Sequence, residues 1–181
     1  MKKLLSFTFI LFTMLSFAQD DLKAPLNQFA RVNLGLHGFE LTYELPISNS
    51  LVWENSFGAG MGSYTADNSI NYRFYLDNPV PYLASELKFH YNREKRTNKG
   101  RSTINNSGNY IGLQTKYSFG DDRTFRLNKT LLTELHWGIQ RPLGERFIFD
   151  LHIGIGYLSD FEFKQGNLSP TFGLRFGYKL F

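Results

Sequence analysis

Carboxylates and histidines interrupt stretches of the sequence that otherwise alternate between apolar and small residues. In RFIFDLHIGIGY, residues 146–157, Asp150 and His152 stand inside an apolar pattern, and Glu134 and His136 do the same in the stretch before it. A carboxylate that orients a histidine is two thirds of a hydrolase triad. The same residues could instead fill a polar interior, so the spacing predicts either catalysis or a buried charge network.

The segment RPLGER, residues 141–146, separates these two stretches. Its proline suits the first central position of a type I turn, and its glycine suits a position with φ > 0 two residues later. A three-residue hairpin closed there places Arg141 opposite Glu145, His136 opposite Asp150 and Glu134 opposite His152. Each acid then has an imidazole partner across the hairpin.

Alternation with a period of two recurs along almost the whole chain and predicts an all-β protein. The expected strands are 31–36, 38–45, 51–63, 82–92, 109–119, 131–141, 146–160 and 171–181. In each strand one face carries no charged residue and is rich in Leu, Ile, Phe, Tyr and Trp. The other face carries charges and most of the glycines, which suggests a cramped interior where side chains from opposite walls meet.

These faces predict a closed, antiparallel, up-and-down transmembrane β-barrel of about eight strands, because only closure satisfies every backbone group in lipid. The charged face would line the lumen as a network of near-balanced pairs. The residues of this lumen charge network are Arg31, Glu40, Glu44, Glu54, Glu86, Lys88, His90, Lys116, Glu134, His136, Asp150, His152, Arg175 and Lys179. A soluble barrel or sandwich, with the uncharged face as its core, is the alternative.

The ends and the composition limit the class of protein further. Residues 1–18 have the basic start, apolar centre and small final residue of a secretory signal peptide. We expect a short segment at 19–28 and the barrel domain at 29–181. The chain has no cysteine, which excludes disulfides, zinc–thiolate sites and thiol catalysis. Its net charge of +4 includes two lysines of the signal peptide and predicts no nucleic-acid partner.

A signal peptide, about eight amphipathic strands and the ending FGLRFGYKLF together resemble the small outer-membrane β-barrel proteins of Gram-negative bacteria. The resemblance implies an outer-membrane location, contact with lipid and lipopolysaccharide, and assembly by the barrel-assembly machinery through the terminal aromatic Phe181. Phe181 has the opposite parity to Tyr178 and Leu180, so the strand ends in a bulge or Phe181 lies beyond the membrane. The resemblance also implies periplasmic connections at 46–50, 94–108 and 142–144, with 64–81, 120–130 and 161–170 outside.

The chain also resembles the outer-membrane lipid A deacylases, small barrels in which a serine follows the histidine by two residues. Here HWGIQ has Gly138 in that position. A metal site formed by His90, His136 and His152 would draw on three strands without ligand spacing. The sequence therefore predicts a non-enzymatic barrel with a structural or binding role and no metal or cofactor. A lipid A-modifying enzyme and a narrow pore are the alternative functions.

Overall fold

The computed structural model describes residues 25–66, 69–73, 79–121 and 127–181. The predicted signal peptide and residues 19–24 lie outside this part of the chain. Eight antiparallel strands close into a barrel, which confirms the prediction of an all-β, closed antiparallel barrel of about eight strands. The barrel strands are β1 (Phe29–Gly35), β2 (Gly38–Pro46), β3 (Leu51–Gly60), β6 (Val80–His90), β7 (Gly108–Ser118), β8 (Thr130–Leu143), β9 (Phe147–Asp160) and β10 (Gln165–Lys179).

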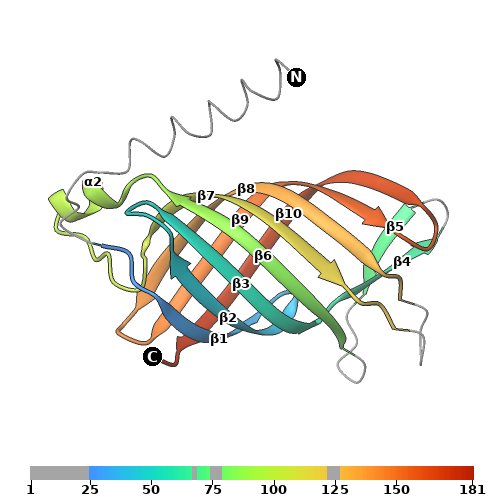
Figure 1. The fold of residues 1–181 in the computed structure, drawn as a ribbon, viewed down its shortest axis with the longest axis horizontal. Coiled ribbons are helices and arrows are strands. Elements are labelled where there is room, and N and C mark those ends of the chain that lie inside the picture. The colour runs from blue at the N-terminus through green and yellow to red at the C-terminus, as the bar shows by residue number, and fades with distance from the viewer. Residues whose placement is uncertain (1–24, 67–68, 74–78, 122–126) are drawn as a thin grey trace, which may run out of the picture.

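Each strand pairs with its neighbours in the chain, and β1 pairs with β10 to close the barrel. The terminal end of the barrel carries the C-terminus, the turns at 47–50 and 144–146, and the helix α2 (Arg93–Asn98). The loop end carries the turns at 36–37 and 161–164 and a separate hairpin of β4 (Gly62–Ala66) and β5 (Ser69–Arg73). Figure 1 shows the strands running obliquely between these two ends.

Successive side chains of a strand point to opposite faces, so the sequence alternation becomes an inside and an outside. Ten hydrophobic residues and 26 polar or charged residues are buried in the described part of the chain. Large apolar residues such as Leu113, Leu135 and Ile153 cover the outer wall and are about half exposed or more. This distribution is the reverse of that in a water-soluble core. The alternative in which the uncharged face forms the core is therefore wrong.

Most predicted strand ends differ from the structure by one or two residues, and three predictions differ by more. The predicted strand 51–63 ends at Gly60, and the chain then enters the β4–β5 hairpin inside the predicted connection 64–81. Strand β10 begins at Gln165, within the predicted connection 161–170, because β9 extends to Asp160 and offers it a partner. The connection 94–108 overlaps α2, a six-residue helix. Among the described residues, no helix is long and apolar enough to cross a membrane.

The predicted register of the β8–β9 hairpin is also wrong. The hairpin closes at Leu143 and Phe147, with Gly144 in the turn at φ 77°, so Arg141 pairs with Phe149 rather than with Glu145. Because the turn begins two residues later in the chain than predicted, Pro142 and Leu143 belong to the paired part of β8. The later turn also sets Glu134 and His136 of β8 opposite Gly156 and Gly154 of β9. The shift is an even number of residues, so it leaves every side chain on its predicted face.

Candidate functional site

The lumen holds a charge cluster, called the central charge cluster, in its half toward the terminal end. Its members are Arg31, Glu54, Lys88, Asp150 and Arg175. The Glu54 carboxylate accepts hydrogen bonds from Arg31 Nη2 at 2.8 Å and Lys88 Nζ at 2.6 Å. Arg175 Nη2 lies 2.8 Å from the other oxygen of Glu54. These side chains come from β1, β3, β6 and β10, so the cluster ties together four walls of the barrel.

Asp150 on β9 completes this central cluster. Its Oδ2 lies 3.1 Å from Lys88 Nζ, 3.4 Å from Arg175 Nη2 and 3.7 Å from Arg31 Nη2. The Tyr110 hydroxyl donates a hydrogen bond of 2.8 Å to its other oxygen. Except for Arg175, the charged side chains of the cluster are at most 1% exposed. Charges this deep are stable only when each has close partners, and here each has several.

A second group, the histidine cluster of Glu86, Glu134, His136 and His152, lies beside the first. His136 Nε2 is 2.9 Å from Glu86 Oε1, and His136 Nδ1 is 3.0 Å from Glu134 Oε1. His152 Nε2 is 3.4 Å from the same Glu134 oxygen. The two imidazole rings stack with their centroids 4.2 Å apart. Glu134 therefore lies between two histidines, one of which also contacts a second carboxylate.

Glycines make room for the rings that fill the lumen. A Cβ at Gly138 would collide with the ring of Tyr110, and one at Gly112 would collide with His136. A Cβ at Gly173 would likewise collide with the ring of His152. In each case the ring lies over a glycine on a neighbouring strand, so the polar face can hold bulky side chains in a narrow barrel. The glycine-rich lumen predicted from the sequence has this packing function.

The terminal end is closed by the terminal plug, residues 93–107. Asn106 donates hydrogen bonds of 2.8 Å to the Asn27 carbonyl and to Glu44 inside the barrel. Gln140 donates to Glu44 Oε1 at 3.0 Å and to the Asn105 carbonyl at 2.9 Å. Burial, and then the nearby charge of Arg96, lowers the pKa of Arg93 to about 10, so Arg93 remains charged at neutral pH. Its guanidinium donates to the carbonyls of residues 103 and 107, within the plug.

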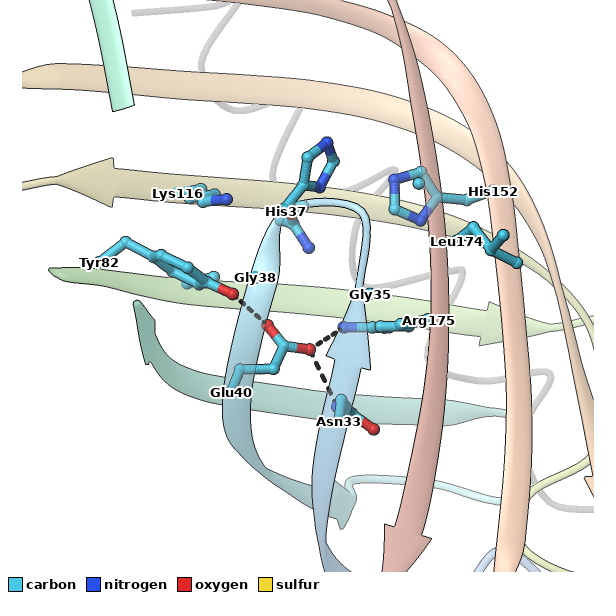
Figure 2. A pocket seen from close by; sticks show the side chains of 13 residues that line it. Asn33, Gly35, His37, Gly38, Glu40, Tyr82, Lys116, His152, Leu174 and Arg175 are labelled. Atoms are coloured by element: carbon cyan, nitrogen blue, oxygen red, sulfur yellow. Dashed lines mark hydrogen bonds and ion pairs between the residues drawn. The ribbon is translucent and has the colours of Figure 1, made fainter. Parts of the chain in front are cut away.

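The loop end of the lumen contains two adjoining cavities. A cavity of about 230 Å³, the loop-end cavity, opens above the histidine cluster and is lined by His37, Lys116, Glu134 and apolar residues such as Leu132 and Leu158. A smaller cavity of about 40 Å³ adjoins it and is also lined by His37 and Lys116. Figure 2 shows His37, Lys116 and His152 around the smaller cavity, with the hydrogen bonds of Glu40 below them.

Lys116 has an unusual environment in this cavity. Its ammonium lies 3.8 Å from the centroid of the Tyr82 ring, and no carboxylate in the described part of the chain is within ion-pair distance of it. The face of an aromatic ring is a weaker partner for an ammonium group than a carboxylate is. The neighbouring ring of His37 is half-buried. Burial, and then the charge of Lys116, lowers the pKa of His37 to about 4, so this ring is neutral at neutral pH.

The structure places the fourteen residues of the lumen charge network on the inner face. Eleven form ion pairs, whereas His90, Lys116 and Lys179 form none among the described residues. The predicted pairing of His136 with Asp150 is absent, because the β8–β9 register puts Gly154 opposite His136. Glu134 and His152 do contact each other, although they are not directly opposite in the β8–β9 ladder. Phe181 is 72% exposed and lies beyond the end of β10.

Sequence reasoning missed several polar partners in the lumen. Tyr82 and Tyr110 alternate with the apolar residues of their strands and therefore point into the lumen. They were not predicted to belong to the charge network because their side chains are aromatic. Gln140 shares the parity of His136, and the same rule would have found it. No local signal pointed to Asn106, whose backbone adopts φ 53° and whose amide reaches Glu44 from outside the strands.

No protein-family model matches the chain, and neither a curated protein nor a solved structure is significantly similar to it. The functional interpretation therefore rests on the fold and the interior described above. Chemically, the interior offers fixed charges held by several partners, a carboxylate between two imidazoles, and a cavity with a cation that has no ion-pair partner among the described residues.

Proposed function

We propose that this protein is an integral outer-membrane β-barrel with a structural or binding role and no enzymatic activity. One observation carries the proposal: the closed barrel has a wall of exposed Leu, Ile, Phe, Tyr and Trp side chains around a charged interior. Water penalises such a surface, whereas the hydrocarbon core of a bilayer requires it. Export through the signal peptide at residues 1–18 belongs to this proposal.

The terminal end would face the periplasm and the loop end would face outward. Outer-membrane barrels combine short periplasmic turns with longer outer connections. The turns at 47–50 and 144–146 are short, and the inserted β4–β5 hairpin lies at the opposite end. The connection after β6 is long for a periplasmic one, but its residues form the terminal plug and thus have a structural use.

The proposed partners follow from this orientation. The apolar wall would contact membrane lipid, and the loop end would contact lipopolysaccharide. The exposed Phe181 next to the last strand is accessible to the barrel-assembly machinery during biogenesis. The central charge cluster fills the lumen with mutually paired groups, which supports a barrel without a continuous water path and a structural role for its charges.

Fractionation with heat-modifiable gel mobility tests the location. We expect the protein in the outer-membrane fraction, migrating differently before and after boiling in mild detergent. A protein recovered from the soluble periplasmic fraction, without a mobility shift, would refute the proposal.

A matched pair of variants tests the lipid contact itself. Leu135 lies in the middle of β8 and is 59% exposed, and Phe163 lies in the turn 161–164 and is 47% exposed. In a bilayer, Leu135→Arg should lower the free energy of unfolding by about 2–4 kcal/mol, because a charge at the midplane is costly. Phe163→Arg, outside the bilayer, should lower it by less than about 1 kcal/mol. Equal and small effects of the two variants in urea titrations of lipid-reconstituted protein would argue that neither side chain contacts lipid.

A further inference from the structure

Three side chains of the histidine cluster have the spacing of metal ligands. Glu134 Oε1 lies 3.0 Å from His136 Nδ1 and 3.4 Å from His152 Nε2. One ligand atom of each residue lies within 4.8 Å of the other two, and the stacked rings would have to rotate for both imidazoles to point at one ion. Bonds of about 2.0–2.1 Å to zinc place neighbouring ligand atoms about 2.9–3.4 Å apart in octahedral to tetrahedral arrangements. Both carboxylate–imidazole distances agree with that range.

We propose that Glu134, His136 and His152 bind one divalent transition-metal ion of the zinc class inside the barrel. Two imidazoles and one carboxylate form a ligand set that suits such ions and leaves coordination positions open. Glu134 and His136 are two residues apart on β8 and therefore share the lumen face. His152 approaches them from β9. The set differs from the three histidines considered in the sequence, because Glu134 takes the place of His90.

The surroundings of His136 support a ligand role for its Nδ1. Its other ring nitrogen, Nε2, lies 2.9 Å from Glu86 Oε1. Metal-binding histidines usually donate their second N–H to a carboxylate or carbonyl, which fixes the ring and directs the free lone pair to the metal. His136 Nδ1 is buried, and it satisfies no hydrogen-bond geometry although Glu134 lies close to it. A metal ion would bridge this nitrogen and the Glu134 oxygen beside it.

The charge of the interior provides an independent argument. The lumen charge network contains six carboxylates but only five lysines and arginines, so it carries an excess of negative charge when its histidines are neutral. Unbalanced charge in a narrow interior is costly, and a bound divalent ion would supply positive charge there. The ion would sit beside Glu86 and Glu134, two of the carboxylates with the fewest lysine or arginine partners.

The adjoining cavities offer the ion a route from the loop end. Glu134 lines the loop-end cavity, and His152 lines the smaller cavity next to it (Figure 2). Open coordination positions would face this space, where water or a small oxygen ligand can reach them. The site depends on the barrel interior and not on the membrane location, so failure of either proposal leaves the other intact.

Cobalt and zinc titrations of the folded, detergent-solubilised full-length protein test the site, after metal is removed with a chelator. We expect one Co²⁺ per barrel with visible absorption bands of a site with nitrogen and oxygen ligands, and displacement of Co²⁺ by one Zn²⁺. Glu134→Gln and His152→Gln should each weaken binding at least tenfold. Glu86→Gln should weaken it about tenfold to a hundredfold, because it removes the carboxylate that orients His136.

His90→Gln is the matched control, because His90 is buried in the same lumen but belongs to no ligand cluster among the described residues. It should bind metal like the wild type. Variants are compared only when heat-modifiable mobility shows a folded barrel. Absence of Co²⁺ bands in the wild-type protein would overturn the proposal even if every variant failed to fold. Unchanged affinity in folded His152→Gln would overturn it as well. Loss of binding in folded His90→Gln, or in folded His37→Gln, would also overturn it, because neither histidine belongs to the proposed ligand set.

Discussion

The two halves of the barrel interior differ in how their charges are held. Toward the terminal end, Arg31, Glu54, Lys88 and Asp150 each contact at least two opposite charges and are almost completely buried. Toward the loop end, Lys116 contacts an aromatic face and borders a cavity of about 230 Å³. The same lumen therefore contains one half in which each of these charges has close partners and one half in which a cation, Lys116, has no ion-pair partner among the described residues.

This difference separates stability from function within one fold. A buried charge with several partners is costly to disturb, because removing one member leaves the others uncompensated. A charge without an ion partner can be removed with less loss, since no opposite charge is orphaned. We expect the folding energy to concentrate in the terminal half and binding to concentrate in the loop half.

The largest expected effect is that of Lys88→Met. Lys88 Nζ lies 2.6 Å from Glu54 and 3.1 Å from Asp150, so its loss leaves two carboxylates short of a partner. The free energy of unfolding should fall by about 3–5 kcal/mol. Urea unfolding in lipid vesicles, followed by tryptophan fluorescence, measures this change. A loss below about 1 kcal/mol would show that the central charge cluster does not hold the barrel together.

The terminal plug should give the next largest effect. Asn106→Ala removes three hydrogen bonds, leaves Glu44 with fewer donors and places an alanine at φ 53°. Together these changes should cost about 2–4 kcal/mol in the same unfolding assay. Asn106→Gly tolerates the backbone conformation and separates the hydrogen bonds from the strain. If both variants unfold like the wild type, the plug is only loosely attached to the barrel.

Replacing a glycine that packs against an aromatic ring should lower the free energy of unfolding by an intermediate amount. A valine at Gly138 would overlap the ring of Tyr110 and displace its hydroxyl from Asp150. We expect Gly138→Val to cost about 1–3 kcal/mol through overpacking. Tyr110→Leu provides the partner for a double-mutant cycle, since the added side chain should be less harmful once the ring is gone. Simple additivity of the two changes would exclude a direct clash.

The fold was predictable because the alternation of apolar and polar residues is visible within each strand. It identifies the inner and outer faces even when the position of a turn is predicted wrongly. The β8–β9 turn was placed wrongly, yet the error shifted the register by an even number of residues, so His136 and Asp150 remained in the lumen. Strand ends moved by only a few residues except at β10 and at the β4–β5 hairpin. Parity thus determines which side chains enter the lumen, whatever the exact register.

The contacts within the lumen were not predictable in the same way. The predicted contact between His136 and Asp150 depended on the turn, and the contact between Glu134 and His152 forms by a different geometry. Glu54 on β3 contacts Arg31 on β1 and Arg175 on β10, although neither strand is next to β3 in the barrel. Such contacts depend on strand tilt and on the room left by glycines, neither of which appears in the pattern of a single strand.

The smallest expected effect is that of Lys116→Met, which makes the same substitution as Lys88→Met in the opposite half. The ammonium of Lys116 lies over the Tyr82 ring, so its loss removes one cation–π contact but orphans no paired carboxylate in the described residues. The free energy of unfolding should change by less than about 1 kcal/mol. The ratio of the two effects, measured in one urea titration series, is the sharpest test of the comparison. If Lys116→Met is as costly as Lys88→Met, the loop half is as firmly bound by charge as the terminal half. In that case its cavity would be a packing defect rather than a site where a ligand binds.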